Sequence, residues 1–349
     1  EYVDNRPNRI TAVVVSTMHA REIETDDIRR LLDAQPGPSV DARSAANARE
    51  ATLTKPPGAL GRLEEISAWL SAWQGRHPPS VGNPHVVVFA GNHGVAARGI
   101  SAYPTEVTAQ MVANFEAGGA AVNQLSKVAG AAFNIHPLDL DMPTADFTQG
   151  PAMDEPAFMA AFNVGWNAVD PDCDLLAIGE MGIANTTAAA AVSHALFGGT
   201  AEDWTGPGTG VTGDALSLKA KVVGEAAQHH RDAARDAIDI LRRVGGRELA
   251  AMAGAVLSAR YKNCPVLLDG YVSGAAAAAL EVRRPGSLDH TLAAHASAEP
   301  GHRRLLDAIG KTPLLDLNMR LGEASGAALA INIVKAAAAC HWKRGTSTF

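Results

Sequence analysis

The segment Leu175–Val192 constrains the fold most, because a short apolar strand runs through a glycine turn into a helix. Its first four residues form an apolar run without alternating polar positions, which is typical of a strand buried on both faces. Asn185 then begins a stretch with helix-start chemistry that continues into alanines. Free N–H groups at such a helix start bind phosphate, although most turns of this kind only redirect the chain. Glu180 stands at the carboxyl end of the strand, where open α/β sheets bind ligands.

Two more apolar runs, Val86–Ala90 and Val266–Asp269, predict further buried strands. Between the strands, helical stretches are expected at residues 108–125, 216–228 and 247–259. Apolar runs separated by helices predict an α/β fold whose parallel sheet is covered on both faces. Residues 139–155 contain two prolines and little periodicity, so we expect a long loop there.

The charge balance argues against nucleic acid as a partner. Lys and Arg number 30 against 37 Asp and Glu, the formal charge is −7, and no basic cluster is long enough to neutralise a run of phosphates. No apolar run approaches the roughly 20 residues that cross a bilayer, so we expect no membrane association. Ile10–Val15 is too short for a signal-peptide core, and the residues before Met18 are interpreted as a tag or as an upstream extension.

The cysteines predict a reducing compartment. Cys173, Cys264 and Cys340 lie far apart in the sequence and form no Cys-x-x-Cys pair, so they predict neither a disulfide framework nor a zinc site. The twelve histidines are scattered along the chain. The sequence therefore predicts no metal site.

Four further parts of the chain carry long motifs in a fixed order, which is a more specific signal than one glycine pattern. They are Leu53–Glu64; Ala90–Val95 with Ser101–Thr108 and Asn114–Ala121; Gly206–Gly210; and His295–His302 with Pro313–Ala330. Together with the turn Gly179–Thr187, these motifs make the chain resemble the nicotinate-nucleotide–dimethylbenzimidazole phosphoribosyltransferases, from about Leu53 to the C-terminus.

The resemblance implies an enzyme that transfers phosphoribose from nicotinate mononucleotide to 5,6-dimethylbenzimidazole or a related base. The products are nicotinate and α-ribazole 5′-phosphate, the nucleotide of the lower ligand of cobalamin. Because the donor carries only a monophosphate, no pyrophosphate has to be neutralised, and we expect neither a metal ion nor another cofactor. The resemblance also implies a cytoplasmic homodimer.

The fold implied by the resemblance is a parallel Rossmann-like sheet with helices on both faces, plus a small helical domain built from both chain ends. We place a large α/β catalytic domain at residues 82–317 and the small domain at residues 48–81 with 318–349. Residues 1–47 are interpreted as an N-terminal extension that is disordered in part or artefactual before Met18.

Glu323 matches the catalytic glutamate of the family. Its implied role is to take the N–H proton of the benzimidazole while the other ring nitrogen attacks C1′ of the ribose. Glu180 is the second catalytic candidate, and one of the two carboxylates would stabilise positive charge on the ribose or hold the other. A helix starts at Ser325, and its dipole would lower the pKa of Glu323, so burial beside Leu321 and Met319 must oppose that effect. The alternative is that Glu323 only caps the helix.

The remaining candidates are assigned by their places in the matched motifs. We expect the phosphate and ribose to contact Gly182, Asn185, Thr186, Thr187, Gly208, Thr209, Gly210, Lys219, His295, Ser297 and Glu299. We expect the acceptor base to contact Ser101, Tyr103, Met111 and Leu321. Alternatives stay open: a plain surface lysine at Lys219, a core position for Tyr103, and a capping and packing role for residues 295–299.

Five positions depart from the usual motifs of the family, at Asn92, Thr105, Ala184, Pro207 and Ala324. Both alanines replace glycines, which matters only if the backbone there needs a positive φ or a close approach to the ligand. Asn92 removes a carboxylate, and Pro207 removes a backbone donor. Two alternatives follow: a non-catalytic protein that binds benzimidazole or its nucleotide, and an enzyme whose acceptor is another benzimidazole, a purine or a phenol.

Overall fold

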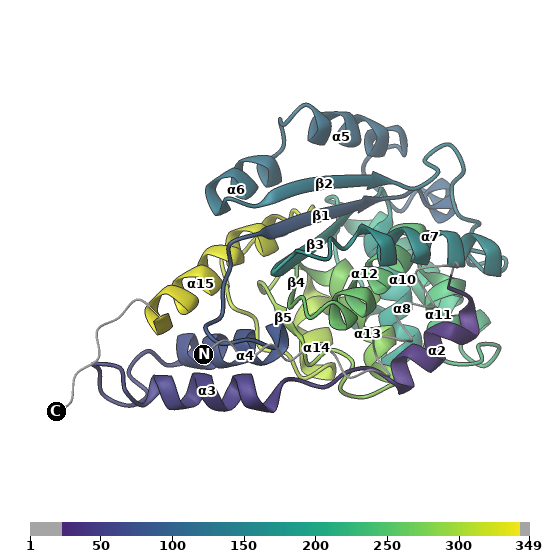
Figure 1. Ribbon diagram of the computed structural model, residues 1–349. Coiled ribbons are helices and arrows are strands. Elements are labelled where there is room, and N and C mark those ends of the chain that lie inside the picture. Colours follow the sequence, from purple (N-terminus) through teal and green to yellow (C-terminus); the bar gives the residue numbers. More distant parts are fainter. Residues whose placement is uncertain (1–22, 343–349) are drawn as a thin grey trace.

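The computed structural model describes residues 23–342, and its centre is one parallel sheet with the strand order β2-β1-β3-β4-β5 (Figure 1). The predicted parallel α/β fold is therefore confirmed. The strands are β1 (Pro84–Ala90), β2 (Ala132–Pro137), β3 (Leu175–Met181), β4 (Val266–Leu268) and β5 (Thr291–Ala293). The three predicted apolar strands correspond to β1, β3 and β4. The expectations for Ile10–Val15 and for the residues before Met18 lie outside the described residues.

The sequence pattern misses the two strands at the edges of the sheet. The residues of β2 are partly or fully exposed along its whole length, so the strand lacks the continuous apolar run of a central strand. β5 is only three residues long, which is too short for a periodicity to be seen.

Helices cover both faces of the sheet. Those of the larger core are α2 (Thr25–Asp33), α7 (Glu155–Ala168), α8 (Asn185–Phe197), α10 (Gly213–His230), α11 (Ala237–Val244), α12 (Arg247–Tyr261) and α13 (Tyr271–Arg283). Those of the other core are α4 (Arg62–Gln74), α5 (Glu106–Glu116), α6 (Ala121–Ala129) and α15 (Ser325–Trp342). The 3-10 helix η1 (Gly94–Arg98), α9 (Ala201–Trp204) and α14 (Pro300–Ala308) add Val95, Trp204 and Leu305 to the larger core, and α3 (Val40–Glu50) contributes to neither core.

The two cores are separated by the sheet because successive side chains of a strand point to opposite faces. In β1, Val87 and Phe89 pack into the larger core, whereas Val86, Val88 and Ala90 pack into the other. The helices α7 and α12 lie on the first face and α5, α6 and α15 on the second (Figure 1). Each central strand is thus buried on both sides, as its apolar sequence predicts.

One predicted helix is wrong in its extent. The stretch 108–125 is divided, because α5 ends at Glu116 and α6 begins at Ala121. Gly118 lies between them with a φ of 74°, a left-handed conformation that commonly ends a helix. The helices predicted at 216–228 and 247–259 are confirmed by α10 and α12. Within residues 23–342, no helix is both long enough and apolar enough to cross a membrane.

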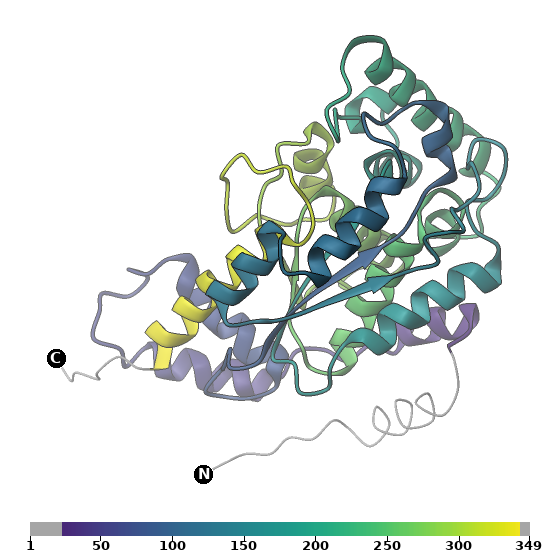
Figure 2. The same cartoon turned by 90° about the horizontal axis from the view of Figure 1, so that it is seen from above.

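The segments expected to form a small domain meet in space. α3 packs on α4, and α4 packs on α15 (Figure 1). α15 also runs beside α6 (Figure 2) and contributes Ala327, Ala328 and Ile331 to the core of the sheet. The residues 318–342 therefore belong to the surroundings of the sheet as well as to the helices α3 and α4, and the domain boundaries stay a prediction.

Two cysteines that are distant in the sequence become neighbours in the fold. The Sγ atoms of Cys173 and Cys264 lie 3.2 Å apart, because each residue shortly precedes one of the paired strands β3 and β4. Both thiols are free and buried.

Candidate active site

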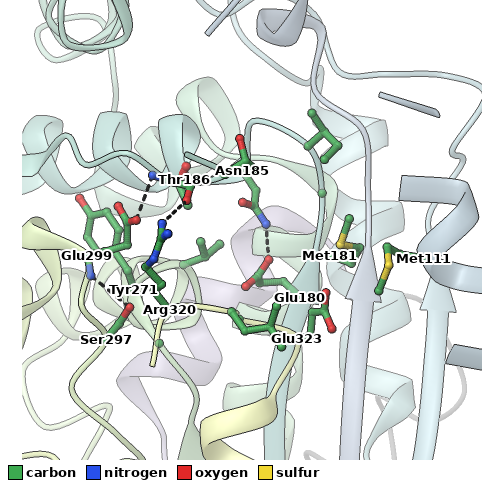
Figure 3. A pocket seen from close by; sticks show the side chains of 18 of the residues that line it. Met111, Glu180, Met181, Asn185, Thr186, Tyr271, Ser297, Glu299, Arg320 and Glu323 are labelled. Carbon is green, nitrogen blue, oxygen red and sulfur yellow. Dashed lines mark hydrogen bonds between the residues drawn. The ribbon is translucent and has the colours of Figure 1, made fainter. Parts of the chain in front are cut away.

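A pocket of about 510 Å³ opens at the carboxyl end of the sheet (Figure 3). The chain connections reverse direction between the neighbouring strands β1 and β3, and open α/β sheets bind their ligands at such a point. The walls come from α5, the end of β3, the starts of α8 and α13, and the segments 295–299 and 320–323. Residues far apart in the sequence therefore face one cavity.

Buried carboxyl groups gather at the pocket. Glu180 and Glu323 line it, and Asp269 is buried nearby at the end of β4. Burial raises the pKa of Glu180 well above its ordinary value, and the charges of Asp269, Glu248 and Glu323 raise it further. Burial, followed by the charge of Asp269, raises the pKa of Glu323 to about 7. The amide of Asn185 donates a hydrogen bond to Glu180. The surroundings of Glu180 therefore favour its protonated form, and Glu323 is close to its own titration point at neutral pH.

The backbone around Glu323 is left-handed over three consecutive residues. The φ angles of Gly322, Glu323 and Ala324 are 78°, 61° and 60°. A Cβ atom on Gly322 would lie 2.7 Å from Oε1 of Glu180. Glycine at position 322 thus allows the chain to pass close to Glu180 on its way to Glu323.

The helix dipole and burial were predicted to act in opposite directions on the pKa of Glu323, and the effect of burial is the larger one. The backbone N–H of Ala327 in the first turn of α15 donates to Oδ1 of Asp269 at 2.8 Å. Asp269 is therefore the carboxylate that meets the positive end of the helix. Glu323 keeps a raised pKa, and the geometry does not favour the alternative that it only caps α15.

The start of α8, a glycine loop and a lysine form the polar side of the site. Nζ of Lys219 donates to Oγ1 of Thr186 and to the carbonyl oxygen of Gly206, each at 2.8 Å. Burial lowers the pKa of Lys219 to about 8, and the charge of Glu299 opposes this. A Cβ atom on Gly208 would lie 2.5 Å from Oγ1 of Thr186 and 2.8 Å from Nζ of Lys219. Lys219 is thus a buried part of the site and not a plain surface lysine.

The same glycine loop is held from two other segments. Oε1 of Glu299 accepts the N–H of Gly208 at 2.9 Å, and Oγ of Ser297 accepts the N–H of Glu299 at 3.3 Å. Nη1 of Arg320 donates to the carbonyl oxygen of Gly208 at 3.4 Å. Arg320 is exposed and lines the pocket, so it places a second positive charge near the loop.

The other side of the pocket is apolar. Its lining side chains are Tyr103, Val107, Met111, Met181 and Leu321. Tyr103 is 56% exposed and stands at the rim, so the alternative that Tyr103 is a core residue is wrong. Oγ of Ser101 lies 3.1 Å from Oγ1 of Thr209, which connects this rim to the glycine loop. In Figure 3, Glu180 and Glu323 lie between the polar side, with Thr186 and Glu299, and the methionines.

Most predicted site residues meet in the pocket. Those that line it are Glu180, Gly182, Asn185, Thr186, Gly208, Thr209, His295, Ser297, Glu299, Tyr103, Met111, Leu321 and Glu323. Four predicted residues do not line it: Ser101, Thr187, Gly210 and Lys219. The side chain of Thr187 is fully buried within α8.

Several lining residues were missed by the sequence reasoning. They are Val107, Met181, Ile183, Gly270, Tyr271, Val272, Arg320 and Gly322. Met181 follows one predicted strand, and Gly270 to Val272 follow another, so the rule that ligands bind at the carboxyl ends of parallel strands could have found them.

Two departures from the usual motifs fall where glycine has an advantage. The φ angles of Ala184 and Ala324 are 76° and 60°, so both meet the condition under which a Cβ atom is costly. A left-handed conformation costs such a residue about 1 kcal/mol or more. Asn92 has a structural partner, because its side-chain amide donates to the carbonyl oxygen of Leu140 at 2.9 Å.

Comparison with known proteins agrees with this geometry. Residues 36–348 match a family described as phosphoribosyltransferase. The chain belongs to this family. A nicotinate-nucleotide–dimethylbenzimidazole phosphoribosyltransferase from Ruegeria sp. (strain TM1040) is 57% identical over 93% of this chain and 95% of its own length. A protein of the same name from Brucella anthropi is 54% identical over 95% of this chain and 97% of its own length.

A solved structure extends the comparison to three dimensions. The crystal structure of CobT from Thermus thermophilus matches with a TM-score of 0.82 and 41% identity, covering 88% of this chain and 97% of that chain. The resemblance inferred from the motifs is confirmed. In this phosphoribosyltransferase the matched region, residues 36–348, includes all five strands and every residue that lines the pocket.

Proposed function

We propose that this phosphoribosyltransferase transfers phosphoribose from nicotinate mononucleotide to 5,6-dimethylbenzimidazole or a related base, giving α-ribazole 5′-phosphate and nicotinate for cobalamin biosynthesis. The observation that carries the proposal is the place of Glu323. Its carboxyl, with a pKa of about 7, stands between the polar side and the apolar side of one pocket. The names of the relatives from Ruegeria and Brucella support the same pair of substrates.

The reaction needs a base because the benzimidazole carries an N–H proton. As the other ring nitrogen bonds to C1′ of the ribose, ionised Glu323 takes this proton. The bond between C1′ and the nicotinate nitrogen breaks with its electron pair going to the nitrogen, so a cationic ring leaves as a neutral pyridine. Attack from the face opposite the leaving group inverts C1′ from β to α.

The carboxyl groups near Glu323 suit the charge that develops on the ribose. Positive charge moves from the nicotinate ring toward C1′ in the transition state, and fixed negative charges stabilise it there. Asp269 and Glu248 contribute negative potential around Glu180. Glu180 accepts the amide of Asn185, and its raised pKa favours the protonated form, which is suited to hydrogen bonding with the ribose or with Glu323.

The phosphate of the donor is assigned to the polar side. N–H groups at the start of α8 carry partial positive charge, which favours an anion. Lys219 and Arg320 add cations, and the hydroxyl of Thr186 adds a neutral hydrogen-bond donor. A bound phosphate would raise the pKa of Lys219 back toward its ordinary value, because a nearby negative charge favours the ammonium form.

The acceptor ring is assigned to the apolar side. A flat bicyclic base suits a surface of methionine and aromatic side chains, which here include Met111, Met181 and Tyr103. Both Tyr103 and Leu321 are more than half exposed, so the rim is open toward acceptors of other shapes. This supports the alternative of another benzimidazole, a purine or a phenol as acceptor.

A non-catalytic role is the second candidate. Ala184 and Ala324 adopt left-handed conformations beside the site, where glycine would be less strained. Such strain could slow turnover in a protein that still binds both ligands. The retained residues Glu180, Lys219 and Glu323 favour the active enzyme.

The resemblance also supports a cytoplasmic homodimer, with a small domain at residues 48–81 and 318–349 and a large domain at residues 82–317. Analytical ultracentrifugation of the full chain tests the dimer. Limited proteolysis tests the domain division, since cleavage is expected near residues 82 and 317.

The deciding experiment mixes nicotinate mononucleotide with 5,6-dimethylbenzimidazole and follows nicotinate by chromatography. Wild type should release nicotinate, and Glu323→Gln should lower the rate of release by roughly 100-fold or more. Calorimetric binding of both ligands without release would support the non-catalytic candidate. A panel of benzimidazoles, purines and phenols with the same donor identifies the preferred acceptor.

A further inference from the structure

Beneath the pocket, His93 and Glu248 form a hydrogen-bonded pair, and the mechanism above uses only the charge of Glu248 and not the pairing. Nε2 of His93 lies 2.5 Å from Oε1 of Glu248, and neither side chain is exposed. His93 stands in the loop after β1, and Glu248 stands in the first turn of α12. The pair thus joins a helix to the loop at which the strand connections reverse.

Three glycines make room for this pair. A Cβ atom on Gly91 would lie 2.6 Å from Oε2 of Glu248, and one on Gly246 would lie 2.8 Å from the same oxygen. A Cβ atom on Gly182 would lie 2.5 Å from the carbonyl oxygen of Gly91, and it would also be 3.3 Å from Oε1 of Glu248 and 3.4 Å from Nε2 of His93. Because Gly182 also lines the pocket, the pair lies directly under a backbone turn that faces the ligand.

Stability alone does not account for the pair. Nδ1 of His93 and Oε2 of Glu248 are buried and have no hydrogen-bond partner among the described residues. Burying such atoms unpaired costs free energy. A buried pair of ionisable groups is also a weak way to stabilise a fold, because packed apolar side chains commonly do as well or better.

Glu248 also faces the carboxyl cluster of the site. Its charge acts on Glu180, together with the charges of Asp269 and Glu323. The amide of Asn185 is the polar neighbour that donates to Glu180 from α8. Among these groups, Glu248 lies outside the pocket lining, so its charge can act on the site without contacting a ligand.

We propose that His93 and Glu248 are positioning residues of the site: the pair supports the Gly182 turn where it meets the donor nucleotide, and Glu248 sets a fixed negative charge beneath Glu180. The inference rests on the proposed function, because it assigns the Gly182 turn to nicotinate mononucleotide. Neither residue touches the reacting atoms, so both act only through Gly182 and Glu180.

Two variants separate the two parts of this inference. Glu248→Gln keeps the shape and removes the charge, whereas His93→Gln keeps the charge and alters the hydrogen bond. We expect both to raise the KM for nicotinate mononucleotide about threefold or more, with little change in the KM for the acceptor. Only Glu248→Gln should lower the pKa of Glu180, because the carboxyl cluster then loses one negative charge. The pH profile of the Glu180 carboxyl carbon in NMR spectra measures this change.

A matched control is Asp239→Asn. Asp239 is a buried carboxylate paired with Arg242 and Arg243 in α11, and it does not line the pocket. We expect this variant to lower the thermal midpoint and to leave the kcat, both KM values and the pH profile unchanged. It shows what the loss of a buried charge does when the role is only structural.

Calorimetric titration with nicotinate mononucleotide accompanies the kinetics. If wild type binds the donor but releases no nicotinate, the proposed function fails, and weaker donor binding by both variants would still support the positioning role. A folded Glu248→Gln variant with wild-type donor affinity and pH profile would overturn the inference. Failure of both variants to fold would also overturn it, because the pair would then be an element of stability.

Discussion

Replacing Glu323 by glutamine should make the protein more stable at alkaline pH while it removes activity. The pKa of Glu323 rises from its ordinary value of 4.5 to about 7, first because burial penalises the charged form and then because Asp269 is near. A shift of this size corresponds to about 3 kcal/mol. Glutamine has nearly the shape of neutral glutamate, so the variant avoids the cost of a buried charge.

The direction of the effect follows from proton binding. The pKa of Glu323 is higher in the folded protein than in the unfolded chain, so the folded protein holds the proton more tightly. The stability that results is complete below about pH 4.5 and is lost as the pH rises through about 7. Wild type and Glu323→Gln should therefore be nearly equal in mild acid and should differ by at most about 3 kcal/mol in alkali.

Guanidinium unfolding curves of both proteins, measured at about pH 5 and about pH 8.5, give the two differences in the free energy of unfolding. The acidic pair of curves is the internal control, because any change in packing caused by glutamine acts at both pH values. A variant that is less stable than wild type at alkaline pH, or a difference that does not change with pH, would refute the reasoning. In the same preparations, Glu323→Gln should release nicotinate at a rate lower than that of wild type by roughly 100-fold or more.

Three further predictions follow from the polar side and the backbone of the site, and a fourth concerns metals. Lys219→Ala should raise the KM for nicotinate mononucleotide far more than that for the acceptor, since Lys219 contacts only the polar side; equal effects would count against it. Wild-type donor binding should weaken above about pH 8, where Lys219 loses its proton, and calorimetry should find no such weakening in Lys219→Ala. Ala324→Gly should change the free energy of unfolding by less than about 1 kcal/mol in denaturant titrations, because relief of the left-handed strain offsets the lost methyl burial. EDTA should leave nicotinate release unchanged, because the donor has no pyrophosphate to neutralise; loss of activity that magnesium restores would contradict this.

The centre of the fold was predictable because burial on both faces requires a continuous apolar run. β1 and β3 have such runs, and both were predicted, although the prediction for β3 ended at Ile178 and the strand continues to Met181. The edge strand β2 does not need one, since its residues stay partly exposed, and its sequence resembles a loop. The division between α5 and α6 falls at Gly118, whose left-handed φ ends the first helix, and the helical periodicity on both sides concealed it.

The site was predictable where a motif follows a strand, and less so where the fold brings in a distant segment. In the sequence, Asp269 is only the end of a predicted strand, because no local pattern shows that it accepts the N–H of Ala327. Thr186 and Thr187 were both predicted to bind phosphate. Neighbouring residues of a helix point about 100° apart, so only one of two such side chains faces the pocket, and here it is Thr186.

The segment 318–323 contributes residues to three parts of the site, so a change in this segment can affect all three parts at once. It carries Arg320 near the glycine loop, Leu321 at the rim of the pocket, and Glu323, which is the proposed base. The middle of the segment is hydrogen-bonded to the pocket segment 295–299, because the N–H of Ala298 donates to the carbonyl oxygen of Met319 at 2.9 Å. A substitution here that admits a new acceptor therefore also moves the base. Under the proposed function, lineages that adopt another lower ligand should accordingly accumulate their first changes on α5, where Met111 lines the apolar side of the pocket.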